Sequence, residues 1–388
     1  MAFIPNRSQD LGDIEEMITN SLSHDEIEKT RLAYKTTGTI KGAAKLLGIA
    51  HRTMQHRMKY IRDDKPKFTA PELPSSLPSI EELLEQRTAQ GDRSLAAEDA
   101  RHLIPIDIHT DGPYALWIWG DPHLDDNGCN LRLLREHVEL AKHPAIYSCQ
   151  IGDICNFWPR VGRLAALYAQ QSTTIHEAIM LAEWFLSQHE QLFVILGNHD
   201  CWQGSGLENP LNWIMRHAGS VTEDHGVRLA LKSPCGSVTR LMARHTFRGN
   251  SQYNINHGMR RELAFGHRDH ILVSGHLHSG GDQGVCHDGD GMVSQLVRVS
   301  GYKQVDHYAN QLGFPPQKIH PSALIIVDPR EPETSRGRVW CAPTVEMGVK
   351  LLNAIRDDYE ATKEASNAAK RQSNSSVDKK RVTRKGSR

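Results

Sequence analysis

Five apolar segments of the sequence each end in polar residues that could bind a metal ion. The polar residues are Asp121-Pro122-His123 after "WIWG", Asp153 after "SCQIG", Asn198-His199-Asp200 after "VILG", His245 after "LMAR", and His276-Leu277-His278 after "ILVSG". Carboxylate and imidazole ligands suit Mn²⁺, Fe²⁺ and Zn²⁺. The set is larger than one tetrahedral ion needs, so it predicts two metal ions that share one carboxylate.

The order and context of these motifs carry the prediction, because each motif alone is weak. A Gly-Asp pair after a strand is usually a turn, and a His-x-His pair arises by chance in a chain with 22 histidines. His245 alone could be a surface or core histidine. In an extended segment, however, residues two apart point to the same side, so His276 and His278 could reach two adjacent metals.

Strands and helices that alternate from residue 114 onward must position these residues. Strands are expected at 115–121, 145–153, 192–200, 237–247, 270–278, 292–302, 322–328 and 338–343, with amphipathic helices at 131–142 and 176–190. Such alternation predicts a mainly parallel sheet, and the strand-rich second half predicts a second packed sheet. The carboxyl ends of parallel strands meet at one edge, where ligands bind.

The ordered motifs resemble those of the calcineurin-like metallophosphoesterase superfamily, over about residues 114 to 345. The resemblance implies an α/β fold in which a two-sheet β-sandwich is flanked by helices. It assigns one divalent ion to Asp121, His123, Asp153 and His278. It assigns the other to Asp153, Asn198, His245 and His276. Manganese is the expected metal, with iron or zinc as alternatives, and His225 and His257 compete with His245 for its position.

The same resemblance implies a phosphoester hydrolase in which Asp153 and His199 are the catalytic residues. A metal-bridging hydroxide would attack phosphorus, and His199 would protonate the leaving alkoxide as a general acid. The family often has a second aspartate in Gly-Asp-x-x-Asp, which hydrogen-bonds the histidine. Here the stretch is "GDICN", with Asn156 at that position. We therefore expect a weaker general acid unless Asp200 compensates.

Residues 25–62 predict three short helices that are similar to a Fis-type helix-turn-helix. The resemblance rests on "GTIKGAAKLLGIAHRTMQHRMKYI" and implies that the last helix enters the major groove of duplex DNA. The residues expected to contact DNA are Arg52, Gln55, His56 and Lys59, with His51 exposed beside them. The alternative is a protein-docking module with a solvated basic face. A homodimer is the usual state of such modules.

The rest of the chain predicts a linker and two loosely ordered ends. Residues 1–24 are expected to be a loose lead-in, and residues 63–112 a proline-rich linker with a short helix over "SIEELLEQRTAQ". The phosphoesterase domain is expected over 113–345, followed by a helix and a disordered basic tail over 346–388. Both ends are basic: 25–67 has eleven Lys/Arg against five Asp/Glu, and 363–388 has nine against two.

Composition favours a cytoplasmic protein with no membrane segment. The seven cysteines have no CxxC spacing, and no run approaches the roughly 18 apolar residues of a membrane span.

The overall prediction is a phosphodiesterase or nuclease that a helix-turn-helix brings to DNA. The alternatives are a phosphomonoesterase, such as a protein phosphatase, with a docking module, and a DNA-binding regulator with a non-turnover metal site. The segment 251–270 is either a basic rim for nucleic acid or an ordinary helix.

Overall fold

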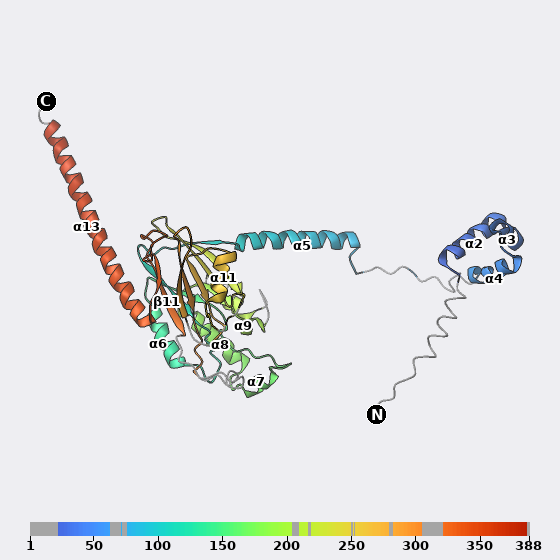
Figure 1. Cartoon of the computed structure of the whole chain (residues 1–388), viewed down its shortest axis with the longest axis horizontal. Coiled ribbons are helices and arrows are strands. Elements are labelled where there is room, and N and C mark those ends of the chain that lie inside the picture. Colours follow the sequence, from blue (N-terminus) through green and yellow to red (C-terminus); the bar gives the residue numbers. More distant parts are fainter. Residues whose placement is uncertain are drawn as a thin grey trace. The chain divides into compact units, whose positions relative to one another are not determined.

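The chain forms two compact units, residues 1–87 and 88–388. The computed structural model describes residues 22–62, 71, 76–203, 209–215, 219–249, 251, 253–278, 282–304 and 321–385 (Figure 1). Residues 1–21 of the expected lead-in and most of the proline-rich stretch lie outside these residues.

The N-terminal unit contains the three helices expected between residues 25 and 62. They are α2 (His24–Thr37), α3 (Ile40–Leu47) and α4 (His51–Arg62). Ser23 and Glu26 form a capping box at the start of α2, and Gly38 and Gly48 adopt positive φ angles of 67° and 66° at the ends of α2 and α3. The three helices enclose a small core of Ala33, Ala43, Ala44, Met54 and Met58.

The second unit is built around two six-stranded sheets. The first sheet has the order β12-β11-β2-β3-β4-β5. Its strands are β2 (Tyr114–Trp119), β3 (Ile146–Gln150), β4 (Gln191–Leu196), β5 (Val221–Asp224), β11 (Ser322–Val327) and β12 (Val339–Cys341). Strands β2 to β5 are parallel, whereas β11 and β12 pair antiparallel at one edge.

The second sheet has the order β1-β6-β7-β8-β10-β9. Its strands are β1 (Ile104–Asp107), β6 (Gly226–Lys232), β7 (Val238–Arg244), β8 (Ile271–Ser274), β9 (Asp282–His287) and β10 (Val293–Arg298). Strands β7, β8 and β10 run parallel to one another. Their carboxyl ends therefore lie at a common edge of this sheet.

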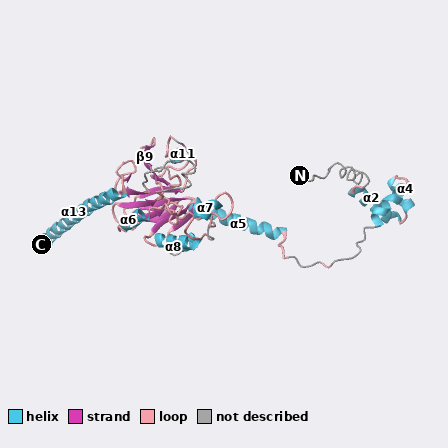
Figure 2. Ribbon diagram, turned by 90° about the horizontal axis from the view of Figure 1, so that it is seen from below, coloured by secondary structure: helices cyan, strands magenta, loops and turns pink. Residues whose placement is uncertain are grey.

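Side chains that alternate along the strands build the layers of the sandwich. Tyr114, Leu116 and Ile118 of β2 belong to the apolar core shared by the two sheets, whereas Trp117 and Trp119 belong to the core under the helices. Helices α6 (Leu131–Ala141), α8 (Ile175–Leu186) and α13 (Val345–Lys385) cover the first sheet, and α11 (His257–Phe265) covers the second. Figure 2 shows the strands between α11 on one side and α6 and α8 on the other.

This architecture confirms the predicted fold class, a two-sheet β-sandwich flanked by helices and preceded by a small helical region. All eight expected strands and both amphipathic helices are present. Strands β5, β6 and β9 and the short helices α7 (Ala165–Gln170), α9 (Asn198–Cys201) and α10 (Pro210–Met215) were not among the individual predictions.

Two predicted segments are more regular than expected. The residues assigned to a linker, 63–112, include strand β1, which pairs in parallel with β6, and helix α5 (Ile80–Arg101), which runs beyond the short helix expected there. The basic end was expected to be disordered after a helix, but α13 continues to Lys385. No proline or glycine interrupts 349–385, and extending a helix that already packs on β11 avoids the cost of nucleation. Among the described residues, no helix is long and apolar enough to cross a membrane.

Candidate metal centre

Five strands deliver the predicted metal-binding residues to one place. Strands β2, β3 and β4 of the first sheet are followed within three residues by Asp121, Asp153 and Asn198, respectively. Strands β7 and β8 of the second sheet are followed within two residues by His245 and His276. The site therefore lies where the carboxyl ends of both sheets meet, as the strand order predicts.

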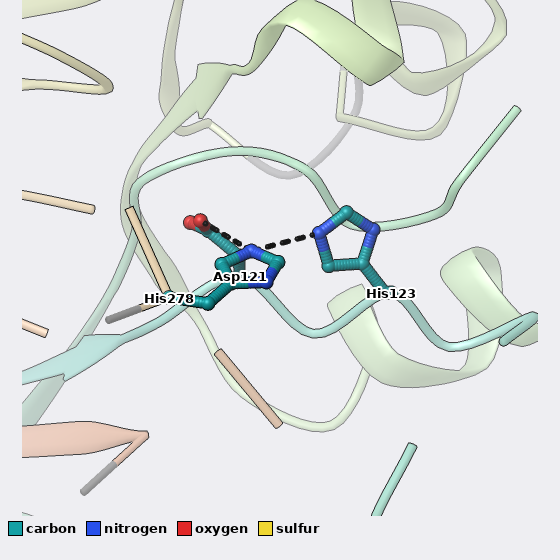
Figure 3. Close-up of side chains that lie close together, drawn as sticks. All are labelled: Asp121, His123 and His278. Atoms are coloured by element: carbon teal, nitrogen blue, oxygen red, sulfur yellow. Dashed lines mark hydrogen bonds and ion pairs between the residues drawn. The ribbon is translucent and has the colours of Figure 1, made fainter. Parts of the chain in front are cut away.

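The first group of donor atoms consists of Asp121, His123 and His278. The Nε2 atom of His278 lies 3.2 Å from Oδ2 of Asp121 and 3.1 Å from Nε2 of His123. Figure 3 shows His278 between the other two side chains. Asp121 and His123 are completely buried. One ligand atom from each residue lies within 4.8 Å of the others, so this group could hold a metal ion.

The second group consists of Asp153, His245 and His276, with Asn198 beside them. The Nε2 atom of His245 lies 3.3 Å from Oδ2 of Asp153 and 3.1 Å from both Oδ1 of Asn198 and Nδ1 of His276. The Nδ1–H of His245 donates to the carbonyl of Ile151 at 2.8 Å, which leaves Nε2 to face the group. A backbone partner of this kind fixes the ring orientation of a metal-binding histidine.

Asp153 connects the two groups. Its Oδ2 atom lies 3.3 Å from His245 in the second group and 4.0 Å from His123 in the first. Asp153, His123 and His199 also form a third set of donors within 4.8 Å. One buried carboxylate thus faces both groups, which is the arrangement that two ions sharing a ligand require.

Three of the donor residues have a backbone conformation that is unfavourable for residues other than glycine. His123, Asp153 and His276 have φ angles of 44°, 50° and 67°. Such strain costs on the order of 1–3 kcal/mol per residue and persists only where surrounding contacts enforce it. Here the amide of His276 donates to Asp121 at 2.8 Å, and the amide of His123 donates to the carbonyl of Asp153 at 3.1 Å.

The glycines before the motifs are required by close approach of the loops. A Cβ atom on Gly197 would lie 2.1 Å from Oδ1 of Asp153, and one on Gly275 would lie 2.6 Å from Oδ1 of Asp121. Gly152 has a φ of 108°, and its Cβ position is 2.5 Å from the backbone nitrogen of Gly197. The strand ends can converge only because these positions have no side chain.

Burial and mutual electrostatics set the charge state of the centre. Burial raises the pKa of Asp153, but His245 and His199 lower it more, to well below its usual range. Burial lowers the pKa of His245, but Asp153 raises it to about 10. Burial lowers the pKa of His123 far below that of free imidazole and that of His199 to about 4. The centre therefore pairs an ionised carboxylate with a cation and with neutral imidazoles.

The chemistry of the donor set fits divalent ions. Oδ1 of Asp121 is buried and has no hydrogen-bond partner among the described residues, a costly state for a carboxylate oxygen. A divalent cation at the first group would compensate the buried Asp121 carboxylate, and one at the second group would replace the proton that His245 carries beside Asp153. Asp121, His123 and His278 would hold one ion, and Asn198, His245 and His276 the other, with Asp153 contributing to both.

His199 is positioned differently from the sequence-based expectation. Its Nδ1–H donates at 2.7 Å to the backbone carbonyl of Asn156, not to a side chain at that position. The side-chain amide of Asn156 instead donates to Oδ2 of Asp126 at 2.9 Å. Two indole rings flank the imidazole, with centroids 4.7 Å away for Trp158 and 4.3 Å for Trp202.

Asp200, which the sequence offered as a possible support for His199, has both carboxylate oxygens bonded to backbone amides. The Asp200 carboxylate is fully buried and accepts hydrogen bonds from the amides of Gly197 at 2.9 Å and Ile154 at 3.0 Å. It therefore ties the loop after β4 to the loop after β3. Burial and the nearby Asp153 raise the pKa of Asp200 to about 8.

The sequence reasoning did not identify several residues around His199. Asp125 accepts a hydrogen bond from the backbone N–H of Asn156 at 2.6 Å. Lys303 forms an ion pair with Asp126 at 3.1 Å, and its own side chain is buried. Only the position of the two aspartates, directly after the first metal motif, could have drawn attention to them. The competing candidates His225 and His257 belong to none of the donor groups found among the described residues.

Comparisons with known proteins give little beyond this geometry. No protein-family model matches the sequence, and no curated protein does. Among the solved structures that match is the protein of unknown function AQ665 from Aquifex aeolicus. It is 14% identical, and the match covers 42% of this chain and 80% of that chain with a TM-score of 0.24. A likeness at this level adds nothing to the fold and the site described above.

Substitution of Gly197 by alanine should abolish metal binding at the centre. The new methyl group would meet Asp153 at 2.1 Å, so the loop after β3 would have to move. Because a ligand that binds only the folded state raises the melting temperature, Mn²⁺ should stabilise the wild type but not Gly197→Ala. Gly289→Ala, which meets no atom within 4 Å, is the matched control. An unchanged Mn²⁺-dependent shift in Gly197→Ala would contradict this role.

Proposed function

We propose that the protein is a metal-dependent phosphoester hydrolase of the calcineurin-like superfamily and that it cleaves phosphodiester bonds in DNA. The observation that carries the proposal is the position of Asp153 between two groups of buried donors, 3.3 Å from His245 and 4.0 Å from His123. Sharing one carboxylate keeps two cations close together, as phosphoryl hydrolysis requires.

The metal ions would supply Lewis acidity to the phosphoryl oxygens and would lower the pKa of a bound water. Manganese is the expected metal, with iron or zinc as alternatives, because carboxylate, amide and imidazole donors suit all three ions. The protein holds these donors in a buried setting. Electrostatic stabilisation of charge that develops on the phosphate is stronger there than in water.

His199 is the residue that would transfer a proton to the leaving oxygen. Its Nδ1 is held by the Asn156 carbonyl, so Nε2 is the atom that can exchange a proton with a substrate. With a pKa of about 4, the imidazole is neutral near pH 7 in the free protein. An anionic phosphate beside it would raise that pKa and favour the protonated form.

The proposal that the substrate is DNA is supported by the N-terminal unit. Arg52, Gln55 and Lys59 of α4 are exposed, while Met54 and Met58 of the same helix are buried in the unit's core. Arg57 is held by Glu26 at 2.7 Å, which fixes α4 against α2. An exposed basic face on a firmly packed helix fits the major groove of a duplex.

Asp153→Asn should abolish hydrolysis of both a small diester and linear DNA. Loss of the carboxylate that faces both donor groups removes several kcal/mol of charge stabilisation, so the rate with Mn²⁺ and bis-p-nitrophenyl phosphate should fall by about 100-fold or more. Asp99→Asn, an exposed carboxylate on α5, serves as the control. Wild-type turnover of p-nitrophenyl phosphate alone would favour the phosphomonoesterase. No turnover of any substrate alongside tight DNA binding would favour the regulator.

His199→Ala and Asn156→Ala should affect catalysis very differently. Loss of a general acid lowers kcat by about 10²- to 10⁴-fold. Asn156→Ala should lower kcat by less than about tenfold, because the carbonyl that binds His199 belongs to the backbone and remains. Steady-state kinetics with the small diester measures both variants. A loss in Asn156→Ala as large as that in His199→Ala would show that the side chain at position 156 positions the histidine.

Removal of two cations from α4 should weaken duplex binding without changing the chemistry. Arg52→Ala/Lys59→Ala should lower affinity for duplex DNA and reduce the slope of log K against log salt by up to about 1.8, since each phosphate contact contributes about 0.9. Fluorescence anisotropy over a salt series measures this. Turnover of the small diester should equal that of the wild type. Unchanged duplex affinity would favour a protein-docking role for these helices.

A further inference from the structure

The surface of α11 and of the segment before it exposes two large aromatic side chains. Tyr253 is 98% exposed and Phe265 is 86% exposed. Large aromatic side chains contribute most to stability when buried, and exposed ones in a polar setting often mark a binding surface. Neither ring is needed for the packing of α11, because buried Met259 attaches this helix to Phe247 and the second sheet.

Two arginines lie beside Phe265 around a small pocket. Arg248, Gly258, Arg261, Glu262, Phe265 and Gly266 line a cavity of about 200 Å³. Both arginines are exposed, and neither has an acidic partner in the part of the chain that the structure describes. Glu262, the acidic residue of the pocket, is engaged by the amide of His267 at 3.1 Å and by its ring at 3.3 Å. Among the described residues, the two guanidinium groups at the pocket therefore form no ion pair.

The pocket is close to the metal centre along the chain. Arg248 follows the metal-binding candidate His245 by three residues, so their Cα atoms are at most about 11 Å apart. Arg298 at the end of β10 donates to the carbonyl of Ile255 at 3.0 Å, which ties the segment before α11 to the sheet. The arginines are thus carried on anchored backbone beside the proposed site of hydrolysis. A polymer that reaches one could reach the other.

We infer that the surface formed by Arg248, Arg261 and Phe265 around this pocket binds single-stranded DNA. Guanidinium groups would contact backbone phosphates, and Phe265 would stack on a base. A polyanion with accessible ring faces complements both features, whereas the bases of a duplex are already stacked. The inference rests on the proposed function in one respect: it names an unpaired strand as the form of DNA presented to the metal centre.

The test measures binding of a fluorescein-labelled oligo-thymidine of about 20 nucleotides to the full-length protein by fluorescence anisotropy, in EDTA so that no hydrolysis occurs. Arg248→Ala/Arg261→Ala should lower the affinity at least tenfold and reduce the salt slope by up to about 1.4, because single-strand contacts contribute about 0.7 each. Phe265→Ala should lower the affinity by about fivefold or more with the salt slope unchanged, because stacking is not an ionic interaction. Arg132→Ala/Arg135→Ala, two exposed arginines on α6 of the opposite face, is the charge-matched control and should bind like the wild type.

Unchanged oligo-thymidine affinity in both Arg248→Ala/Arg261→Ala and Phe265→Ala would overturn the inference, as would an equal loss in the α6 control. A loss confined to duplex DNA would overturn it as well. Failure of the proposed function would look different, because binding would respond to these variants while no substrate is turned over with Mn²⁺. All three substituted side chains are exposed, and the melting temperature of each variant verifies that it folds.

Discussion

The convergence of buried carboxylates and imidazoles at one edge of the sandwich is the constraint on which the rest of the structure depends. Asp121 and Asp153 are removed from water, and the histidines around them point their ring nitrogens at one another over about 3.1 Å. A buried charge without compensation is among the most costly features a protein can contain. Bound cations would compensate these buried negative charges, and the donor atoms are close enough together to bind them.

Much of the surrounding fold serves to hold this costly arrangement. Glycines allow the loops after β3 and β4 to touch, and left-handed backbone turns His123, Asp153 and His276 toward the centre. Asp200 links the two loops, because its carboxylate accepts hydrogen bonds from the backbone N–H groups of Gly197 and Ile154. The strain is stabilised by the sandwich core, in which the strands that lead into the site are almost entirely buried. Rigid strands are better supports for metal ligands than mobile loops.

The sequence predicts the strands and the donors well, because both depend on short local patterns. An apolar run of strand length followed by glycine and a ligand residue is visible without knowledge of the fold. The support for His199 is not visible in this way, since it depends on a backbone carbonyl, which every residue has, rather than on the side chain of Asn156. Lys303 is equally hidden, because it meets Asp126 only through folding. Strand β1 is short and half-exposed, so its pairing with β6 determines its structure more than its own residues do.

In the proposed function, distinct parts of one chain have distinct tasks: the N-terminal helices would bind duplex DNA, the surface around Phe265 would hold an unpaired strand, and the metal centre would cleave it. The proposal depends above all on Asp153 joining two metal ions. Electron paramagnetic resonance of the protein titrated with Mn²⁺ tests this most directly, because two manganese ions that share a bridging carboxylate are magnetically coupled. The signal of isolated Mn²⁺ should be replaced by a coupled spectrum as the second equivalent binds, and Asp153→Asn should remove the coupling. A single bound ion, or two ions that remain uncoupled in the wild type, would contradict it.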